Sequence, residues 1–228
     1  MKSSIHIPMP VMMIILAGLF ALLVIFGTCW FSRQAQLTKL GEQEAALRSD
    51  LVQLNTWGKW TIDYVKIDKA LGYLSKNKLT PELHAVLTQQ IWQISRSYYI
   101  DPLLILAVVA QESRGNPNAI GKVRSGKESG AMGLMQIKLE TAQLMGQRFG
   151  LVIEKSEDLL RPEVNVTVGT AYLMRLLVKY GNLKEALVAY NMGHSAVDKM
   201  LQNDQPLPTR YYDRVISKYR NLAKMSFF

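Results

Sequence analysis

The chain contains 228 residues, 49% of them apolar, and carries a formal net charge of +9. This length suits one domain of ordinary size with appendages. The basic residues are spread along the chain and form no stripe interleaved with aromatic residues, so we expect no nucleic-acid partner and interpret the charge as a surface that lies near anionic lipid or an anionic polymer.

An uncharged apolar segment occupies residues 11–31. A helix of this length, at ~1.5 Å per residue, spans the ~30 Å hydrocarbon core of a bilayer. The alternative is a cleaved signal peptide, which has an apolar stretch of about 7–15 residues followed by a small-residue cleavage site. The segment is longer and ends in Thr28-Cys29-Trp30-Phe31, so we expect a retained transmembrane anchor over residues 1–32. Cys29 is the only cysteine, which excludes an internal disulfide.

The next segment, residues 33–78, is predicted to be a helical stalk or linker. Its leucines recur at intervals that approach a heptad repeat, at positions 37, 40, 47, 51 and 54. Glu44 interrupts the apolar seam and the run is short, so a stalk is favoured over a dimerisation coiled coil. Residues 57–73 are rich in aromatic side chains, and the sequence assigns them no role.

Capping residues mark a series of helices in the rest of the chain. Helix starts are predicted at Thr80, Asp101, Asn182, Ser195 and Thr209, where side chains that cap helices occur, twice with proline at the first helical position. The helix after Thr80 is expected to end near Tyr98, and the last helix near Leu222. No segment alternates with the period of a strand, so we expect an all-α fold with one long loop, residues 115–133.

Glu112 is the candidate catalytic residue. It follows an unbroken apolar run, residues 103–110, and Gly115 ends the predicted helix. Desolvation and the partial negative charge of a helix C-terminus both disfavour a carboxylate. Both should raise the pKa of Glu112 toward the range in which a glutamic acid donates a proton near neutral pH. By pattern alone, the alternative is a glutamate that emerges into solvent where its helix ends.

Four motifs follow one another from residue 112 onward. They read Glu-Ser-Arg-Gly-Asn-Pro at 112–117, Gly-Leu-Met-Gln-Ile at 133–137, Ala-Tyr-Asn-Met-Gly at 189–193 and Arg-Tyr-Tyr-Asp-Arg-Val at 210–215. Thr141-Ala142 lies just beyond the second motif. Over about residues 80–219 the chain therefore resembles the lytic transglycosylases, a lysozyme-like family that acts on bacterial cell walls. One departure is an extra basic segment, residues 122–129.

The resemblance implies a lysozyme-like helical catalytic domain over residues 79–228, with Glu112 as its catalytic residue. It also implies substrate contacts at Met135, Gln136, Thr141, Tyr190, Asn191 and Tyr211. Tyr211 is expected to hold its hydroxyl near Glu112, with Tyr212 as the rival because the preceding Thr-Arg aligns either way. By pattern alone, Met135 is more typical of a core, and Tyr190-Asn191 of an ordinary helix C-terminus before glycine.

The same resemblance implies the reaction. The family cleaves the β-1,4 bond between N-acetylmuramic acid (MurNAc) and N-acetylglucosamine (GlcNAc) of peptidoglycan and leaves a 1,6-anhydro-MurNAc end. Glu112 would act first as a general acid and then as a base on the C6 hydroxyl of the sugar. Glycosidases ordinarily use two carboxylates, about 5–5.5 Å or ~6.5–9.5 Å apart, whereas the motifs supply one. We expect no cofactor and no metal.

Two other functions are compatible with this sequence. The first is a lysozyme-type hydrolase that uses water as the acceptor. The second is a catalytically silent wall-binding module, whose anchor and stalk recruit a secretion or conjugation machine. Such a machine is also a possible partner of an active enzyme, beside peptidoglycan strands and the membrane.

The expected location is the bacterial inner membrane, with one span and the catalytic domain in the periplasm, because peptidoglycan lies outside that membrane. The positive-inside rule weakly favours the opposite orientation, since Lys2 precedes the span whereas Arg33, Lys39 and Arg48 follow it. The imbalance is small and acidic residues are interspersed, so the location of the substrate decides the predicted orientation.

Overall fold

The computed structural model describes residues 8–76 and 79–225, apart from the side chains of Ile14, Ile15, Leu54 and Trp57. The ends of the predicted anchor, stalk and catalytic domain at 1–7, 77–78 and 226–228 lie outside the described residues, as does the side chain of Leu54 in the leucine series. The chain divides into two units, Met1–Gly58 and Lys59–Phe228.

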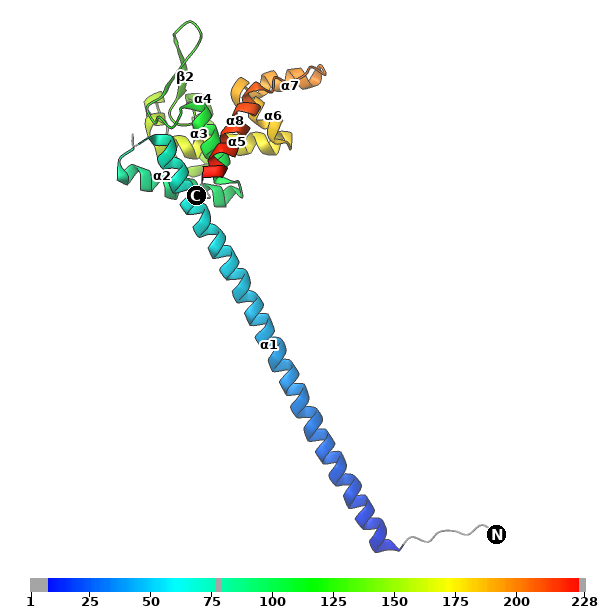
Figure 1. Ribbon diagram of the computed structural model, residues 1–228. Coiled ribbons are helices and arrows are strands. Elements are labelled where there is room, and N and C mark those ends of the chain that lie inside the picture. The colour runs from blue at the N-terminus through cyan, green and yellow to red at the C-terminus, as the bar shows by residue number, and fades with distance from the viewer. Residues whose placement is uncertain (1–7, 77–78, 226–228) are drawn as a thin grey trace. The chain divides into compact units, whose positions relative to one another are not determined.

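Helices dominate the described residues, which confirms the predicted helical class. They are α1 (Met9–Ser75), α2 (Pro81–Tyr98), α3 (Pro102–Glu112), α4 (Leu139–Gly146), α5 (Pro162–Tyr180), α6 (Leu183–Met192), α7 (His194–Gln202) and α8 (Arg210–Met225), as Figure 1 shows. Short 3-10 helices cover Gln147–Phe149 and Ser156–Leu160.

The first unit consists of the N-terminal part of α1, which runs without a break through the predicted anchor and most of the predicted stalk. Among the described helices, α1 is the one that is long and apolar enough to cross a membrane by length and composition, with a mean hydropathy of 2.8 over its most apolar window. Leu37, Leu40, Leu47 and Leu51 of the leucine series are exposed. An i,i+4 ion pair joins Arg48 to Glu44 at 2.9 Å on the same helix.

In the second unit, α3 and α5 form the centre. Helix α3 is buried along nearly its whole length and packs on α8, while α5 contacts α2, α4 and α6. Both predicted proline-led helix starts are confirmed. The Thr80 hydroxyl accepts from the Leu83 amide at 3.3 Å, and the Asp101 carboxylate accepts from the Leu103 amide at 2.9 Å. The caps therefore set where the helix that ends in Glu112 begins.

The expectation that the loop over 115–133 contains no strand is wrong. Strands β1 (Ile120–Lys122), β2 (Glu128–Met132) and β3 (Ile137–Lys138) form a small antiparallel sheet in the order β1-β2-β3. The strands are too short for alternation of apolar and polar residues to be recognised. Gly126, at the turn between β1 and β2, has φ +84°, which favours glycine. The extra basic segment is the tip of this hairpin.

The last turns of α1 belong to the second unit. Ile67, Ala70 and Leu71 are buried in its core, at the spacing of one face of a helix. At Gly115, where φ is +74°, an added Cβ would lie 2.8 Å from the carbonyl oxygen of Leu74. The compact unit therefore begins at Lys59, earlier than the predicted domain start at residue 79.

This boundary leads to a prediction about truncation. A chain that begins at residue 57 keeps every buried residue of α1, so we expect it to be soluble and folded and to keep the activity of the intact chain. A chain that begins at residue 79 loses Ile67 and Leu71, and core losses of this size cost about 2–5 kcal/mol for each residue. Thermal unfolding of both fragments tests this, and equal melting temperatures would contradict it.

Candidate active site

Glu112 lies at the last position of α3, where its side chain is half-buried. The hydroxyl of Tyr211, from the first turns of α8, donates a hydrogen bond to Oε1 of Glu112. Burial raises the pKa of Glu112, whereas the Tyr211 hydrogen bond and the positive charge of Arg214 oppose this rise without cancelling it. The side chain is thus a carboxylic acid with a raised pKa beside a hydroxyl donor.

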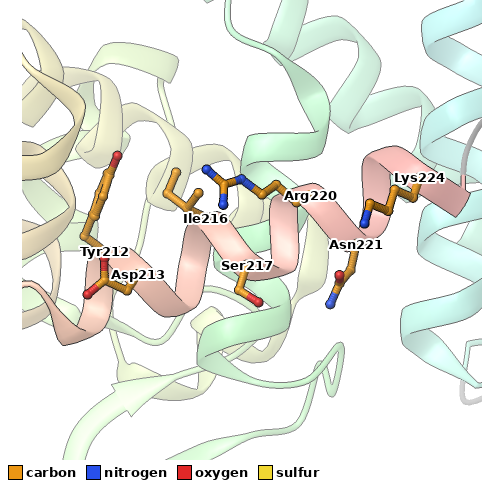
Figure 2. A pocket seen from close by; sticks show the side chains of 7 residues that line it. All are labelled: Tyr212, Asp213, Ile216, Ser217, Arg220, Asn221 and Lys224. Carbon is orange, nitrogen blue, oxygen red and sulfur yellow. The ribbon is translucent and has the colours of Figure 1, made fainter.

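The packing of α8 on α3 decides which of the two adjacent tyrosines meets Glu112. Tyr211 is only 4% exposed and shares its helix face with Val215, which is fully buried. Tyr212 points elsewhere, because neighbours on a helix are about 100° apart. Figure 2 shows Tyr212 lining a surface hollow on α8 that includes neither Glu112 nor Tyr211.

Tyr190, near the end of α6, is the second phenol at the site. Its hydroxyl donates to the backbone carbonyl of Met135 at 2.9 Å, and its ring packs on Tyr172 with centroids 5.5 Å apart. Burial, and then the neighbouring Glu112 carboxylate, raise the pKa of Tyr190 well above its ordinary value. Tyr190 thus stays a neutral donor that connects the second motif to the surroundings of Glu112.

Asn165 of α5, which is fully buried, fixes the backbone of the second motif. Its Oδ1 accepts from the Met135 amide at 2.7 Å, and its Nδ2 donates to the carbonyls of Met132 and Leu159 at 2.8 and 2.9 Å. Gly133, with φ +75°, allows this approach, because an added Cβ would lie 2.4 Å from Nδ2 of Asn165. The loop is therefore fixed by one buried amide.

The predicted substrate-contact residues fall into two groups. Glu112, Tyr190 and Tyr211 lie together, with the backbone of Met135. The side chain of Met135 is fully buried against Gly169 and Thr170, and its predicted contact with substrate stays a prediction.

Among the described residues, no hydrogen bond joins the side chains of the remaining predicted contacts, Gln136, Thr141 and Asn191, to Glu112. Gln136 is half-buried, and its Nε2 donates to the carbonyls of Ala119 and Gly133 at 3.0 and 2.9 Å, so it closes the loop. Thr141 is half-buried in the first turn of α4, and Asn191 is exposed at the end of α6. Their substrate contacts stay predictions.

Two residues at the site were not identified from the sequence. Arg214 acts on the charge of Glu112 and lies three residues after Tyr211, a spacing that places both on one side of a helix. Asn165 fixes the second motif from another helix, and no local pattern marks an asparagine for this role. No group of three or more His, Cys, Asp or Glu side chains suited to a metal occurs among the described residues.

Asn165→Ala is expected to destabilise the protein by about 3 kcal/mol, because unsatisfied buried polar groups cost ~1–3 kcal/mol each. The Met135 amide and two carbonyls would lose their partners. Chemical unfolding measures the change, with the exposed Asn191→Ala as the matched control. A loss no larger than that of the control would show that water replaces the buried amide.

The raised pKa of Glu112 makes its contribution to stability depend on pH. The folded state binds the proton more tightly than the unfolded state, so this contribution is complete below the ordinary glutamate pKa and is lost as pH rises through the raised folded pKa. Glu112→Gln does not titrate, so its melting temperature should rise relative to that of the wild type as pH increases from below the ordinary glutamate pKa through the raised folded pKa. A difference that does not vary with pH would contradict the raised pKa.

Residues 89–212, more than half of the chain, match the family described as transglycosylase SLT domain, so the chain belongs to this family. The resemblance inferred from the four motifs is confirmed.

Several relatives carry names that describe this class of protein. Endo-type membrane-bound lytic murein transglycosylase A of Citrobacter koseri is 31% identical over 141 residues, which cover 57% of this chain and 62% of the relative. The transglycosylase of Enterobacteria phage PRD1 is 36% identical over 105 residues, covering 46% and 34%. A solved structure, the 70 kDa soluble lytic transglycosylase of Escherichia coli, has a TM-score of 0.44 and 28% identity, covering 60% of this chain and 22% of that one. The chain thus spans less than two thirds of each of these proteins.

Proposed function

We propose that this chain is a peptidoglycan lytic transglycosylase that cleaves the β-1,4 bond between MurNAc and GlcNAc. The observation that carries the proposal is the half-buried carboxyl of Glu112, which has a raised pKa and accepts a hydrogen bond from Tyr211. A carboxyl in this setting keeps a proton at a pH where an ordinary glutamate has lost it. Membership of the transglycosylase SLT domain family supports the same activity.

The proposed reaction has two proton transfers, both through Glu112. In the first, protonated Glu112 donates to the glycosidic oxygen while the bond from that oxygen to C1 of MurNAc breaks. In the second, the carboxylate takes the proton of the C6 hydroxyl while O6 forms a bond to C1, which closes the 1,6-anhydro ring. Tyr211 and Arg214 both favour the ionised form of Glu112 and so stabilise it between the two steps. The proton ends on Glu112, and no water is consumed.

A single carboxyl is sufficient for this sequence of steps. Burial raises the pKa of Glu112, and the groups that lower it are the Tyr211 hydroxyl and the Arg214 guanidinium. A water-consuming glycosidase would use a second carboxylate about 5–10 Å away. The sequence motifs supply one carboxyl, Glu112, and this supports the anhydro-forming reaction over hydrolysis.

The proposed location is the bacterial inner membrane, with the apolar part of α1 as a single span and the catalytic unit in the periplasm. The apolar window of α1 supports a span, and one relative is named as membrane-bound. In this arrangement the anchor keeps the enzyme next to the polymer it cuts. Recruitment of a secretion or conjugation machine stays a prediction.

Mass analysis of the fragments released from purified cell wall tests the reaction. The transglycosylase reaction yields fragments with 1,6-anhydro-MurNAc ends, each one water lighter than the product of hydrolysis. Fragments with reducing ends would identify a lysozyme-type hydrolase instead. A protein that binds the wall and releases nothing would identify a silent binding module.

A further inference from the structure

An aromatic and cationic cluster joins the last turns of α1 to α2, on residues that the catalytic proposal does not use. The guanidinium carbon of Arg96 lies 4.3 Å from the ring centroid of Trp60 and 4.7 Å from that of Trp92. The indole nitrogen of Trp92 donates to the Trp60 carbonyl at 3.0 Å, and Tyr64 meets the Trp92 ring edge-on with centroids 6.2 Å apart. The two indoles and the guanidinium thus form one ordered unit.

Arg96 has spare hydrogen-bonding capacity in this cluster. Arg96 is exposed, and none of the ion pairs or side-chain hydrogen bonds among the described residues involves it. Contact with the indole faces uses the plane of the guanidinium and leaves its in-plane N–H groups free. A guanidinium already held in place loses little freedom when it binds a planar anion through two parallel hydrogen bonds.

A surface cavity surrounds this guanidinium. Its lining consists of Trp60, Trp92, Gln93, Arg96, Ser97 and Tyr99. Gln93 offers an amide that donates and accepts, and Ser97 offers a hydroxyl oxygen. Tyr99, left-handed at φ 53° where α2 ends, is 91% exposed and presents an open ring and hydroxyl. The cavity therefore combines one cation, neutral hydrogen-bonding groups and an aromatic surface.

We propose that this cavity is a second binding site, for a carboxylate-bearing peptide, and that its occupant is the acidic peptide stem of peptidoglycan. The guanidinium can form paired hydrogen bonds with a carboxylate. Gln93 and Ser97 can hydrogen-bond to peptide amides, and the Tyr99 ring can contact aliphatic side chains. The identity of the occupant rests on the proposed function, since that polymer carries peptides on its glycan strands. The site would hold the enzyme on strands that still carry peptides.

Binding of the full-length chain in detergent to two forms of cell wall tests this site. All proteins carry Glu112→Gln, so that the wall is not cut, and sedimentation measures binding to intact wall and to wall stripped of peptides by an amidase. Arg96→Gln is expected to weaken binding to intact wall by about tenfold, the usual scale for a lost charged hydrogen bond. Binding to stripped wall should not change.

Two further variants separate the site from general effects. Arg96→Lys keeps the cation over the indoles but lacks the planar fork, so its binding to intact wall should lie between those of the parent and Arg96→Gln. Arg220→Gln removes an exposed arginine from α8 and should bind like the parent. Melting temperatures identify any variant in which the junction of α1 and α2 is disrupted. If Arg96→Gln is such a variant, the binding of Arg96→Lys is compared with that of the parent instead.

Several outcomes would overturn the proposal. They are unchanged binding of Arg96→Gln to intact wall, an equal loss on stripped wall, and a loss confined to anionic phospholipid vesicles, which would identify a membrane-binding site. The catalytic proposal is tested separately by cleavage of stripped wall with Glu112 present. Cleavage without stem-dependent binding would overturn the second site alone, and stem-dependent binding without cleavage would overturn the catalytic proposal alone.

Discussion

Replacing Glu112 with glutamine is expected to lower the wall-cleaving activity by about 10²–10⁴-fold, the usual contribution of a general acid–base group. Glutamine keeps the shape of the side chain and can still accept the hydrogen bond of Tyr211, but it cannot donate and recover a proton. The expected loss lies toward the upper end of this range, because one carboxyl serves both proton transfers. Release of soluble fragments from purified wall measures the effect.

The control for Glu112→Gln is Glu140→Gln. Glu140 is an exposed carboxylate in the first turn of α4, close to the second motif, and it has no assigned part in the reaction. This variant should keep normal activity. Near-normal activity of folded Glu112→Gln would show that another group supplies the proton, and the proposed mechanism would then be wrong.

Tyr211→Phe is expected to lower the rate by roughly ten- to a hundredfold, because hydrogen bonds to a charged group contribute ~1.5–3 kcal/mol. The hydroxyl of Tyr211 stabilises the Glu112 carboxylate that exists between the two steps. It also lowers the pKa of Glu112, so its removal should raise that pKa further. The alkaline limb of the pH–rate profile, where Glu112 loses its proton, should therefore move to higher pH.

Tyr212→Phe provides the matched control at the adjacent position. Tyr212 lies on another side of α8, in the hollow of Figure 2, which does not include Glu112, and the hydroxyl that bonds to Glu112 is that of Tyr211. Its rate and pH profile should equal those of the wild type. If instead Tyr212→Phe slows the reaction and Tyr211→Phe does not, the pairing of Tyr211 with Glu112 is wrong and Tyr212 is the residue that faces the site.

The sequence by itself determined the features that depend on neighbouring residues. Thr80 and Asp101 marked helix starts because a cap forms within a single turn, from a side chain to an amide two or three residues away. The prediction of a membrane span over residues 11–31 likewise depended only on the length and composition of that segment. The choice of Tyr211 over Tyr212 rested on the spacing to Val215 and Tyr219, and the structure brings Tyr211 to Glu112.

Only the tertiary structure decided which distant residues meet. Tyr211 and Glu112 are 99 positions apart, and Asn165 fixes the Met135 amide from 30 positions away. The burial of Met135 and the charge of Arg214 beside Glu112 arise from the same packing of helices on one another.

The sequence assigned no role to the aromatic residues near the end of α1, and the structure places Trp60 in contact with Arg96 of α2. The physical reason is the separation along the chain over which each kind of interaction restricts the residue types. Backbone hydrogen bonding within one turn constrains the residue types nearby, whereas a contact between two elements constrains only shape and polarity, which many residue types satisfy.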